Sequence, residues 1–553
     1  MPAFTLEIVR EDRESVFDNT GTPLTHATRI FNPDYLADFV TDKPHHLRFM
    51  KPMNTENALY ENVADLVNLD HATYVDAMPI EAMVSLCNYL GCGLWFCQWH
   101  RASDALMDYC AEYIRANLAA SLSVYIEEYN EAWNFGYEFS KYYWAEGLRK
   151  WGAAGAGTIS TVNGSKTVTG VGTNFDTIFE NASGSKSLTI GDRSFQVDFG
   201  EVITATSFTC KGSGQISITD NDWYHGRSNN LEGFAYKSSL TMQRWIAVFA
   251  ASEQRFRLTT VLGARLEDGP TNVLLACAAW SGEPDFVAPN TVHDVVAVNP
   301  YFGSGMFNQA DIKAAVKALQ ASSPGTPVNE LYRDLMLGQH ATLDDNKNLI
   351  YVRDGLKETR VVAESYGVGM ISYEGGTHMV HSPAVNSSDT DILDSYTTFM
   401  HSPEAITVFS QWAELNMLYL DGPIMQFQHA GAWTRYGFWG MRPRYGYAGD
   451  SRLNSLRNYA DKDPWWGPYF PPQWVLSVPD QAWEVGVAPT LNLREFCTAN
   501  AIAFSGDSPP GTTLNSDGTF SGSPSASSPG TIYTFAVTNA GGSNLLNVYI
   551  EVP

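Results

Sequence analysis

The sequence predicts an α/β protein: a (β/α)8 TIM barrel with a small all-β module inserted in it and a β-sandwich after it. Eight short apolar segments alternate with helix-like segments over about 430 residues, the pattern of a parallel barrel with helices outside. Two further segments, 152–221 and 500–553, differ from the rest in composition and alternate as strands do. We therefore expect three kinds of domain in the 553 residues.

The predicted barrel strands are short and apolar, and helical patterns separate them. They lie at 4–9, 47–50, 93–98, 123–129, 257–262, 294–299, 368–374 and 423–428. Helical spacing follows Pro79 over 80–90 and follows Asn308 over 310–320. A doubly wound open sheet is the alternative, and it is disfavoured because no glycine-rich phosphate loop follows any of these strands.

Composition sets the expected domain boundaries. Residues 152–221 contain no Trp, Met or His, whereas the whole chain has 15 Trp. Helical patterns flank this segment at 141–152 and 236–254, so we expect it to interrupt one helical region of the barrel. Residues 500–553 contain no Lys, Arg or Trp. The predicted domains are 1–151 and 222–499 for the barrel, 152–221 for the inserted β module and 500–553 for the β-sandwich.

The charge balance excludes two classes of partner. Lys and Arg number 35 against 60 Asp and Glu, for a formal net charge of −25. Binding to nucleic acid or to an anionic membrane surface needs clustered basic residues instead. No apolar run reaches the ~18 residues of a membrane span. Aromatic residues make up 13% and charged residues only 17%, which suits neutral, polyhydroxylated partners.

The start of the chain and its cysteines indicate where it folds. Residues 1–12 lack the basic and apolar regions of a secretory signal, so we expect synthesis in the cytoplasm. The seven cysteines are odd in number and match neither a disulfide framework nor a zinc ribbon. We expect them to be reduced, mostly buried thiols, and we expect no metal site.

Two glutamates stand where reactive side chains lie in a barrel, at the ends of strands. The fourth predicted strand ends at Asn130 and Glu131, and the seventh ends at Glu374, which two glycines follow. Glycosidic cleavage uses such a pair, because one carboxyl protonates the leaving oxygen while the other attacks or stabilises the sugar cation. The glycines would let a substrate approach the backbone closely. Taken alone, Glu131 fits a helix cap or a salt bridge equally well.

An Asn-Glu pair ending strand four with a Glu ending strand seven resembles clan A of the glycoside hydrolases, which are retaining (β/α)8 enzymes. The stretches FNPDYLADF…LRFM, YIEEYNEAWN, VNPYFG and YEGGTH look like a cellulase-like bacterial subgroup of that clan, over most of 30–440. The resemblance implies that Glu131 is the general acid/base and Glu374 the nucleophile. It also implies that no cofactor takes part.

The same resemblance assigns supporting roles. Asn130 would bind the sugar 2-hydroxyl, Arg48 would help to keep the nucleophile ionised, and Tyr301 would touch the nucleophile. Trp433 would supply the aromatic platform of strand eight. The chain departs from the subgroup at Lys51, which replaces the usual Asp, and this leaves the substrate preference near Lys51 open.

Four more residues near the ends of strands three and four are weaker candidates. Glu127 shares the side of its strand with Glu131 by the period of two, and we expect it deeper in the barrel. Trp133 lies at the same strand end as Glu131. His100 and Asp104 follow strand three and would line the pocket, although a structural role is equally expected for His100.

Two pairs of residues are open to more than one interpretation. His378 and His381 are expected in a loop rather than in a metal site, because no HExxH-type spacing accompanies them. Trp465 and Trp466 would either stack on sugar rings or seal the side of the barrel.

The accessory segments carry a second resemblance. SPPGTTLNSDGTFSGSP…YTFAVTNAGGS resembles the immunoglobulin-like (Ig-like) modules of bacterial and phage surface proteins, and GTISTVNGSKTVTGVGTNF resembles small β modules of phage tails. With the missing signal, they imply a polysaccharide depolymerase that is part of the virion or extracellular after lysis. Its partners would be a bacterial exopolysaccharide or β-glucan-like substrate and other virion or tail proteins. The alternative is a non-catalytic tail or adhesion protein that binds glycan.

Overall fold

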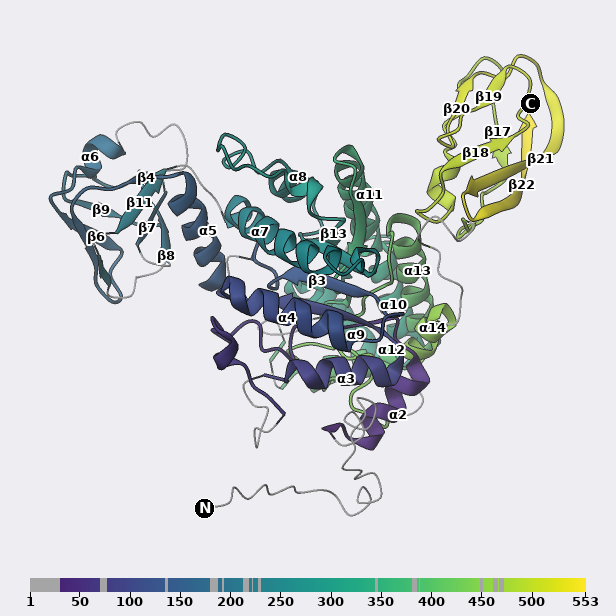
Figure 1. Cartoon of the computed structure of the whole chain (residues 1–553). Helices are drawn as coiled ribbons and strands as arrows, with labels where there is room; N and C mark the ends of the chain where they lie inside the picture. Colours follow the sequence, from purple (N-terminus) through teal and green to yellow (C-terminus); the bar gives the residue numbers. More distant parts are fainter. Residues whose placement is uncertain are drawn as a thin grey trace. The chain divides into compact units, whose positions relative to one another are not determined.

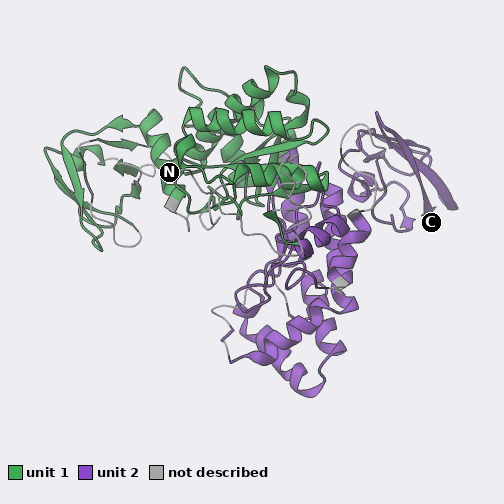
Figure 2. Ribbon diagram, turned by 60° about the horizontal axis from the view of Figure 1, so that its bottom comes forward, with its two compact units in different colours: residues 1–32, 46–297, 362–368 green, residues 33–45, 298–361, 369–553 purple. Residues whose placement is uncertain are grey.

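The structure is a computed structural model, and it divides into two compact units (Figure 2). The first comprises Met1–Asn32, His46–Ala297 and Val362–Val368, and the second comprises Pro33–His45, Val298–Val361 and Gly369–Pro553. The described residues are 30–69, 77–134, 138–179, 187–190, 193–211, 218–220, 222–226, 230–343, 347–379, 385–386, 388–447, 451–460, 466 and 472–553.

One six-stranded sheet carries the predicted barrel strands in chain order. Its order is β1 (His46–Arg48), β2 (Gly93–Gln98), β3 (Val124–Glu128), β12 (Leu258–Gly263), β13 (Val295–Val298) and β15 (Gly369–Ser372). The pairings from β1 through β13 are parallel. A doubly wound sheet reverses its strand order at a switch point. The sequential order therefore favours the barrel-type arrangement over the open-sheet alternative.

The predicted strands at 47–50, 93–98, 123–129, 257–262, 294–299 and 368–374 correspond to these six, while the predicted strand at 4–9 lies outside the described residues. The prediction of a strand at 423–428 is wrong, because this segment is irregular. There the Met425 N–H donates to Ser372 Oγ (3.1 Å) and the Phe427 N–H donates to the Gly375 carbonyl (3.0 Å). These bonds to a side chain and a loop carbonyl replace a regular strand ladder.

Helices follow the strands as the alternation predicted (Figure 1). Local signals set their ends: Ser103 accepts a hydrogen bond from the Leu106 N–H at the start of α4, and Gly91 takes a left-handed φ of 68° after α3. The helices are α2 (Pro33–Asp42), α3 (Ile80–Leu90), α4 (Asp104–Asn117), α5 (Glu138–Trp151), α7 (Asn230–Ala250), α8 (Asp268–Ala276), α9 (Ala310–Ser322), α10 (Thr326–Leu337), α11 (Leu349–Ser365), α12 (Thr390–Met400), α13 (Pro403–Tyr419) and α14 (Ser451–Ala460).

Burial explains why β2 and β3 read as nearly continuous apolar runs. Every residue of both strands is buried, as expected of a parallel strand that is covered on both faces. The exceptions in composition are Glu127 and Glu128, two buried acids side by side at the end of β3. Buried acids need partners, and the partners of this pair lie at the candidate site and in the helices beside it.

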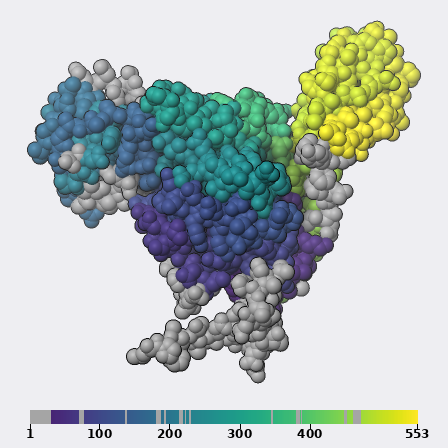
Figure 3. Space-filling view, viewed as in Figure 1, coloured from purple at the N-terminus to yellow at the C-terminus, as the bar shows by residue number. Residues whose placement is uncertain are grey.

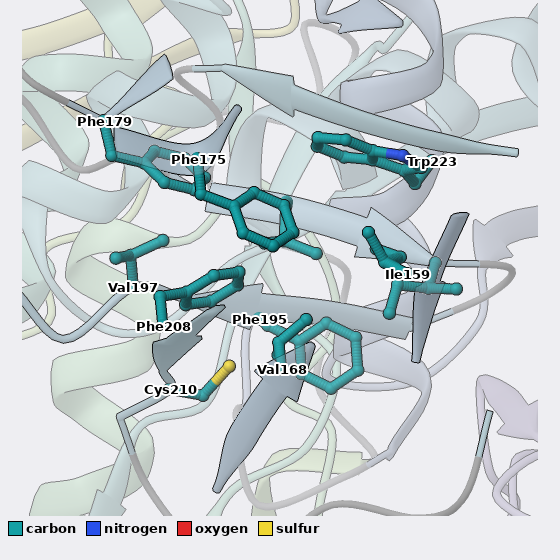
Figure 4. Close-up of a cluster of buried hydrophobic side chains, with 11 residues drawn as sticks. Ile159, Val168, Phe175, Phe179, Phe195, Val197, Phe208, Cys210 and Trp223 are labelled. Carbon is teal, nitrogen blue, oxygen red and sulfur yellow. The ribbon is translucent and has the colours of Figure 1, made fainter. Parts of the chain in front are cut away.

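The predicted β insert forms its own packed layers. Sheets of order β10-β5-β6-β9 and β4-β11-β7-β8 enclose a core that includes Phe175, Phe208 and Trp223 (Figure 4). Because Trp223 is part of this core and β11 pairs with β4 and β7, the folded segment continues past residue 221 to Gly226. The elements are β4 (Ala153–Ala154), β5 (Thr158–Thr161), β6 (Thr167–Val171), α6 (Phe175–Ile178), β7 (Ser187–Ile190), β8 (Arg193–Gln196), β9 (Ser207–Thr209), β10 (Ile218–Asp220) and β11 (Trp223–Gly226).

The C-terminal residues gather into one packed β body, drawn in yellow in Figure 3. Its core joins Phe535, Val548 and Ile550 to Trp483 and Cys497, which precede residue 500. The packed body therefore begins before the boundary that composition predicted. A sheet of order β17-β22-β21-β18 and the pair β19-β20 form it. The strands are β17 (Gln481–Ala482), β18 (Ala503–Gly506), β19 (Thr512–Leu514), β20 (Phe520–Gly522), β21 (Ser528–Asn539) and β22 (Gly542–Val552).

Candidate functional site

The chain leaves β3 through a strained turn that carries the first candidate carboxylate. Tyr129 (φ 62°) and Glu131 (φ 48°) both have a left-handed backbone conformation, which residues other than glycine rarely adopt. The turn is held on two sides: the Tyr129 N–H donates to the Gln98 carbonyl (2.9 Å), and Asn230 Nδ2 of α7 donates to the Ala132 carbonyl (3.1 Å). Backbone strain of this kind collects at functional sites.

A buried ion pair lies directly under this turn. Arg48 at the end of β1 donates to Glu127 through Nε (2.9 Å) and Nη2 (3.1 Å), and Trp95 Nε1 donates to the same carboxylate (3.0 Å). The side chains of Arg48 and Glu127 are 6% and 1% exposed. Burial raises the pKa of Glu127, while the charge and hydrogen bonds of Arg48 oppose that shift.

The same arginine fixes Asn130. Arg48 Nη2 donates to Asn130 Oδ1 (2.8 Å), and Asn130 is buried. Because Oδ1 accepts from Arg48, the amide keeps its Nδ2 as a hydrogen-bond donor for other groups. Arg48 was predicted to support Glu374. Its partners in the first unit include Glu127 and Asn130, so Glu127, predicted as a weaker candidate, helps to anchor this arginine.

Glu131 itself is half-buried and faces Asn134. Asn134 Nδ2 donates to Glu131 Oε2 (3.1 Å), and the Asn134 N–H donates to the Glu131 carbonyl (2.8 Å). Trp133 lies beside it, half-buried, and its Nε1 has no hydrogen-bond partner within the described part of the chain. The turn thus presents a carboxyl group and an indole N–H close together in sequence.

The residues predicted after the third strand separate into two environments. His100 is buried against the rings of Tyr129 (4.8 Å between centroids) and Tyr142 (5.0 Å), so it packs beneath the strained turn. Asp104 is 73% exposed and pairs with Arg244 of α7 (2.8 Å). Its carboxylate lies at the start of α4, where Asp104 and Arg244 line a cavity of about 800 Å³ between α4 and α7. That Asp104 lines the substrate pocket stays a prediction.

In the second unit, Glu374 follows β15 and is 7% exposed. The two glycines after it make room for neighbouring side chains. A Cβ on Gly375 would lie 3.0 Å from Trp412, and one on Gly376 (φ 114°) would lie 2.5 Å from Gln426 Oε1. The glycines thus accommodate protein packing, and the approach of a substrate to their backbone stays a prediction.

Four rings form an aromatic cluster next to Glu374. Tyr301 of β14 (Tyr301–Phe302) pairs with Gly376 of β16 (Gly376–Thr377). Its ring meets His378 (5.1 Å), Trp439 (5.7 Å) and Phe427 (6.5 Å), and His378 meets Trp439 edge to face (4.4 Å, 89°). Tyr301 therefore pairs with a residue that follows the candidate nucleophile by two positions in the sequence.

Trp433, the predicted aromatic platform, has partners of its own, and its role stays a prediction. Trp433 packs on His401 and Arg452, and its Nε1 donates to the Gly440 carbonyl (2.9 Å). Trp439 is the tryptophan that contacts Tyr301. Both stand in the run GAWTRYGFWG, and the strand period could not select between them because this segment is not a strand.

The remaining predictions have separate outcomes. Lys51 is exposed and pairs with Glu56 (2.5 Å). Trp466 meets the edge of His45 (5.0 Å) and lines a cavity of about 230 Å³ together with Pro44 and Leu453. His381 and Trp465 lie outside the described residues. All seven cysteines are buried, as predicted.

The sequence did not predict that His378, Phe427 and Trp439 would contact Tyr301. His378 follows β16 in an irregular segment, as the prediction of a loop requires. Within the described ranges, no three His, Cys, Asp or Glu side chains are grouped as a metal site would require. No described helix has the length and apolar character needed to cross a bilayer.

No family model and no curated protein matches the chain. Solved structures with low similarity include an endo-beta-1,4-mannanase double mutant from Cellulomonas fimi (12% identity, TM-score 0.18, covering 58% of this chain and 58% of that chain). Others are an endo-fucoidan hydrolase from glycoside hydrolase family 107 (13%, 0.16, 57% and 46%) and an engineered protein (13%, 0.19, 58% and 60%). The chain spans less than two thirds of each of these three structures. TM-scores of this size do not establish a shared fold, so a function must be argued from the chain's own residues.

Proposed function

We propose that this chain is a retaining glycoside hydrolase of the clan A type that cleaves β-glycosidic bonds in a polysaccharide. Glu131 is the general acid/base and Glu374 the nucleophile. In the first step Glu374 attacks the anomeric carbon while Glu131 protonates the departing oxygen, which leaves a glycosyl ester on Glu374. In the second step Glu131 takes a proton from water, and the water oxygen displaces Glu374 with net retention.

The observation that carries the proposal is the strained turn at Glu131. A left-handed φ at a glutamate costs free energy, and it persists here because Gln98, Asn134 and Asn230 hold the backbone. The neighbouring Asn130 is locked by Arg48 with its donor end available for a sugar hydroxyl. A helix cap or a surface salt bridge would need neither the strain nor the buried support.

The surroundings of Glu374 fit a nucleophile. Its carboxylate is largely buried, and Tyr301 and Trp439 offer aromatic surface in the same cluster. Aromatic faces suit the C–H faces of sugar rings, and carboxyl pairs cleave glycosides without a cofactor. The catalytic step in this proposal therefore uses carboxyl groups alone.

The proposed biological setting is a virion-borne or lysis-released depolymerase, with other virion or tail proteins as partners. It is supported by the resemblance of the C-terminal segment to Ig-like modules and of the insert to phage-tail β modules. The packed core of each segment is that of a folded module, and we propose spacing or adhesion as the role of both. The substrate in this setting is an exopolysaccharide or a β-glucan-like polymer.

A glycan-binding protein without catalysis is the rival function, and the aromatic cluster fits it as well as it fits an enzyme. A reducing-end assay of the full chain on a panel of bacterial exopolysaccharides and β-glucans separates the two. We expect new reducing ends with at least one polymer, and none from Glu374→Ala. Binding of a polymer without release of reducing ends would favour the rival.

A further inference from the structure

The geometry points to a function for His378 that the sequence did not suggest. The His378 N–H donates to the Phe302 carbonyl (2.7 Å), which fixes the backbone at the end of β16. The imidazole stands nearly perpendicular to both Tyr301 (80°) and Trp439 (89°). Trp439 is fixed in turn, since its Nε1 donates to the Tyr436 carbonyl (3.3 Å). The ring is therefore held in one orientation by its neighbours, as a preorganised binding group must be.

Two buried polar atoms near Gly376 have no hydrogen-bond partner among the described residues. His378 Nδ1 and Gln426 Oε1 are buried and have no hydrogen-bond partner among the residues that the structure describes. Both flank Gly376, because Gln426 Oε1 faces it and His378 lies two residues beyond it. Buried polar atoms are nearly always hydrogen-bonded, so a group left unpaired calls for an explanation, such as a ligand that completes the set.

The charges of His378 and of the groups near it in the chain favour an uncharged ligand over an anionic one. Burial lowers the pKa of His378, so its imidazole is neutral at neutral pH and offers one donor and one acceptor. Three arginines of the following segment already have partners. Arg442 pairs with Asp38 and Asp42 (both 2.5 Å), and Arg452 donates to the Gly440 carbonyl. Arg435 donates to the Val385 carbonyl (3.5 Å) and to the Tyr436 hydroxyl (2.8 Å). With the carboxylate of Glu374 close in the chain, an anionic sugar would meet repulsion.

We propose that His378, Trp439 and Tyr301 form a subsite for an uncharged sugar unit beside Glu374. The imidazole of His378 hydrogen-bonds a sugar hydroxyl, and the aromatic rings contact the sugar's C–H face. A hydroxyl both donates and accepts, so it pairs with either tautomer of a neutral imidazole, whereas a carboxylate or sulfate accepts only. The inference rests on the proposed function, and it adds that His378 determines specificity for neutral sugars over uronic acids and sulfated sugars.

The test uses steady-state hydrolysis by the full chain. The probes are p-nitrophenyl β-D-glucoside, β-D-mannoside, β-D-galactoside and β-D-xyloside, with p-nitrophenyl β-D-glucuronide as the anionic member. We expect kcat/KM for the best neutral substrate to exceed that for the glucuronide by about tenfold or more. His378→Phe keeps a ring but removes the hydrogen bond, and it should raise KM about tenfold with kcat within about threefold. His378→Gln should restore KM to within about threefold of wild type.

The matched control is His401→Phe, because His401 packs on Trp433 and Tyr447 in the same unit and should leave KM unchanged. An unchanged KM in His378→Phe, or a preference of wild type for the glucuronide, would overturn the subsite. If wild type hydrolyses none of these probes and no polymer, the proposed function fails. The subsite is then tested by binding of cello- and manno-oligosaccharides. Binding that His378→Phe weakens about tenfold supports it, and binding that is absent or insensitive to His378→Phe overturns it.

Discussion

At the scale of single residues, the site depends on a buried arginine, Arg48, whose partners include the carboxylate of Glu127 and the amide of Asn130. The Arg48 side chain is nearly inaccessible to solvent, and it donates hydrogen bonds to Glu127 from both Nε and Nη2. Breaking a buried pair from one side leaves an uncompensated charge. The orientation of Asn130, and with it the strained turn at Glu131, therefore depends on Glu127.

Removing the charge of Glu127 should cost far more than removing that of a surface acid. We expect Glu127→Gln to lower the free energy of unfolding by about 3–5 kcal/mol. The matched control is Asp108→Asn, since Asp108 also binds an arginine with both oxygens (Arg244, 3.1 and 2.6 Å) but is 39% exposed. That variant should change stability by about 1 kcal/mol or less. Equal losses in chemical denaturation would contradict the buried-pair interpretation.

Glu128, the next residue of β3, is a second buried acid, and it is expected to make stability depend on pH. Its oxygens accept from Tyr143 of α5 and from Thr241 of α7 (both 2.8 Å). Burial raises the pKa of Glu128 from 4.5 to about 7, although Tyr143, Lys237 and Thr241 favour its charged form. Because the folded state holds this proton more tightly than the unfolded state, the contribution of Glu128 to stability should be fully present below pH 4.5 and be lost as the pH rises to about 7.

The expected contribution is about 3 kcal/mol between pH 4.5 and neutral pH, at about 1.4 kcal/mol for each unit of pKa shift. Glu128→Gln cannot titrate, so its stability should depend less on pH by about that amount. Urea denaturation of both proteins in the same buffers measures the difference. Parallel stability–pH curves for the two proteins would remove Glu128 as the cause.

At the scale of elements, the β insert joins two helices that pack together. A Cβ on Gly233 of α7 would lie 1.9 Å from the Tyr143 carbonyl of α5, and one on Gly226 would lie 3.5 Å from Gly152 Cα. The ends of the insert are therefore adjacent. Closely spaced ends are what tolerated insertions share.

Replacing 153–225 by a short Gly/Ser linker should leave the rest of the chain folded and turnover of an aryl glycoside within about threefold. The complementary fragment, 153–226 alone, should fold around its own core. Its one tryptophan, Trp223, is fully buried and reports folding by blue-shifted fluorescence. An unfolded remainder after the replacement would show that the insert supports α5 and α7. Loss of polymer cleavage alone would show that it shapes substrate access.

The same elements show which features a sequence can reveal. Residues 93–98 and 368–374 were predictable as strands because continuous burial makes them continuously apolar. The segment 423–428 was not, because its apolar composition serves packing while its amides bond to Ser372 Oγ and a loop carbonyl. Composition located both β segments, but it placed the end of the insert and the start of the C-terminal body wrongly. Trp223 and Trp483 lie outside the compositional boundaries, yet each packs into the core of its β segment.

The sequence could likewise predict some features of the candidate site and not others. Glu131 and Glu374 could be proposed because strand ends carry reactive groups in barrels, and position along the chain marks strand ends. The partner of Arg48 and the choice of Trp439 over Trp433 depend on side-chain directions in three dimensions. Outside helices and strands, the spacing of residues in the sequence does not indicate where their side chains point.

At the scale of the whole molecule, the C-terminal β body is expected to be separable, but at a boundary before residue 500. Trp483 and Cys497 contribute to its core, and Glu495 pairs with Lys357 of α11 (2.7 Å). Truncation after Asn500 would strip this core of Val548 and Ile550 and expose apolar surface.

We therefore expect a chain that ends at residue 471 to be soluble and as active as wild type on an aryl glycoside within about threefold. A chain that ends at residue 500 should aggregate or unfold, because it retains part of a core without the rest. Size-exclusion chromatography of the two truncated chains compares them directly. A soluble, monomeric 1–500 chain would restore the boundary that composition predicted.

The central claim is the division of labour between Glu131 and Glu374, and azide rescue tests it most directly. Glu374→Ala should abolish turnover of every substrate. Glu131→Ala should retain turnover of a substrate with a good leaving group, such as a 2,4-dinitrophenyl β-glycoside, because that oxygen needs no proton. Added azide should then accelerate Glu131→Ala, and NMR of the product should show the β-glycosyl azide. An α-glycosyl azide from Glu131→Ala, or full activity of Glu374→Ala, would contradict the assignment of a retaining mechanism to this pair.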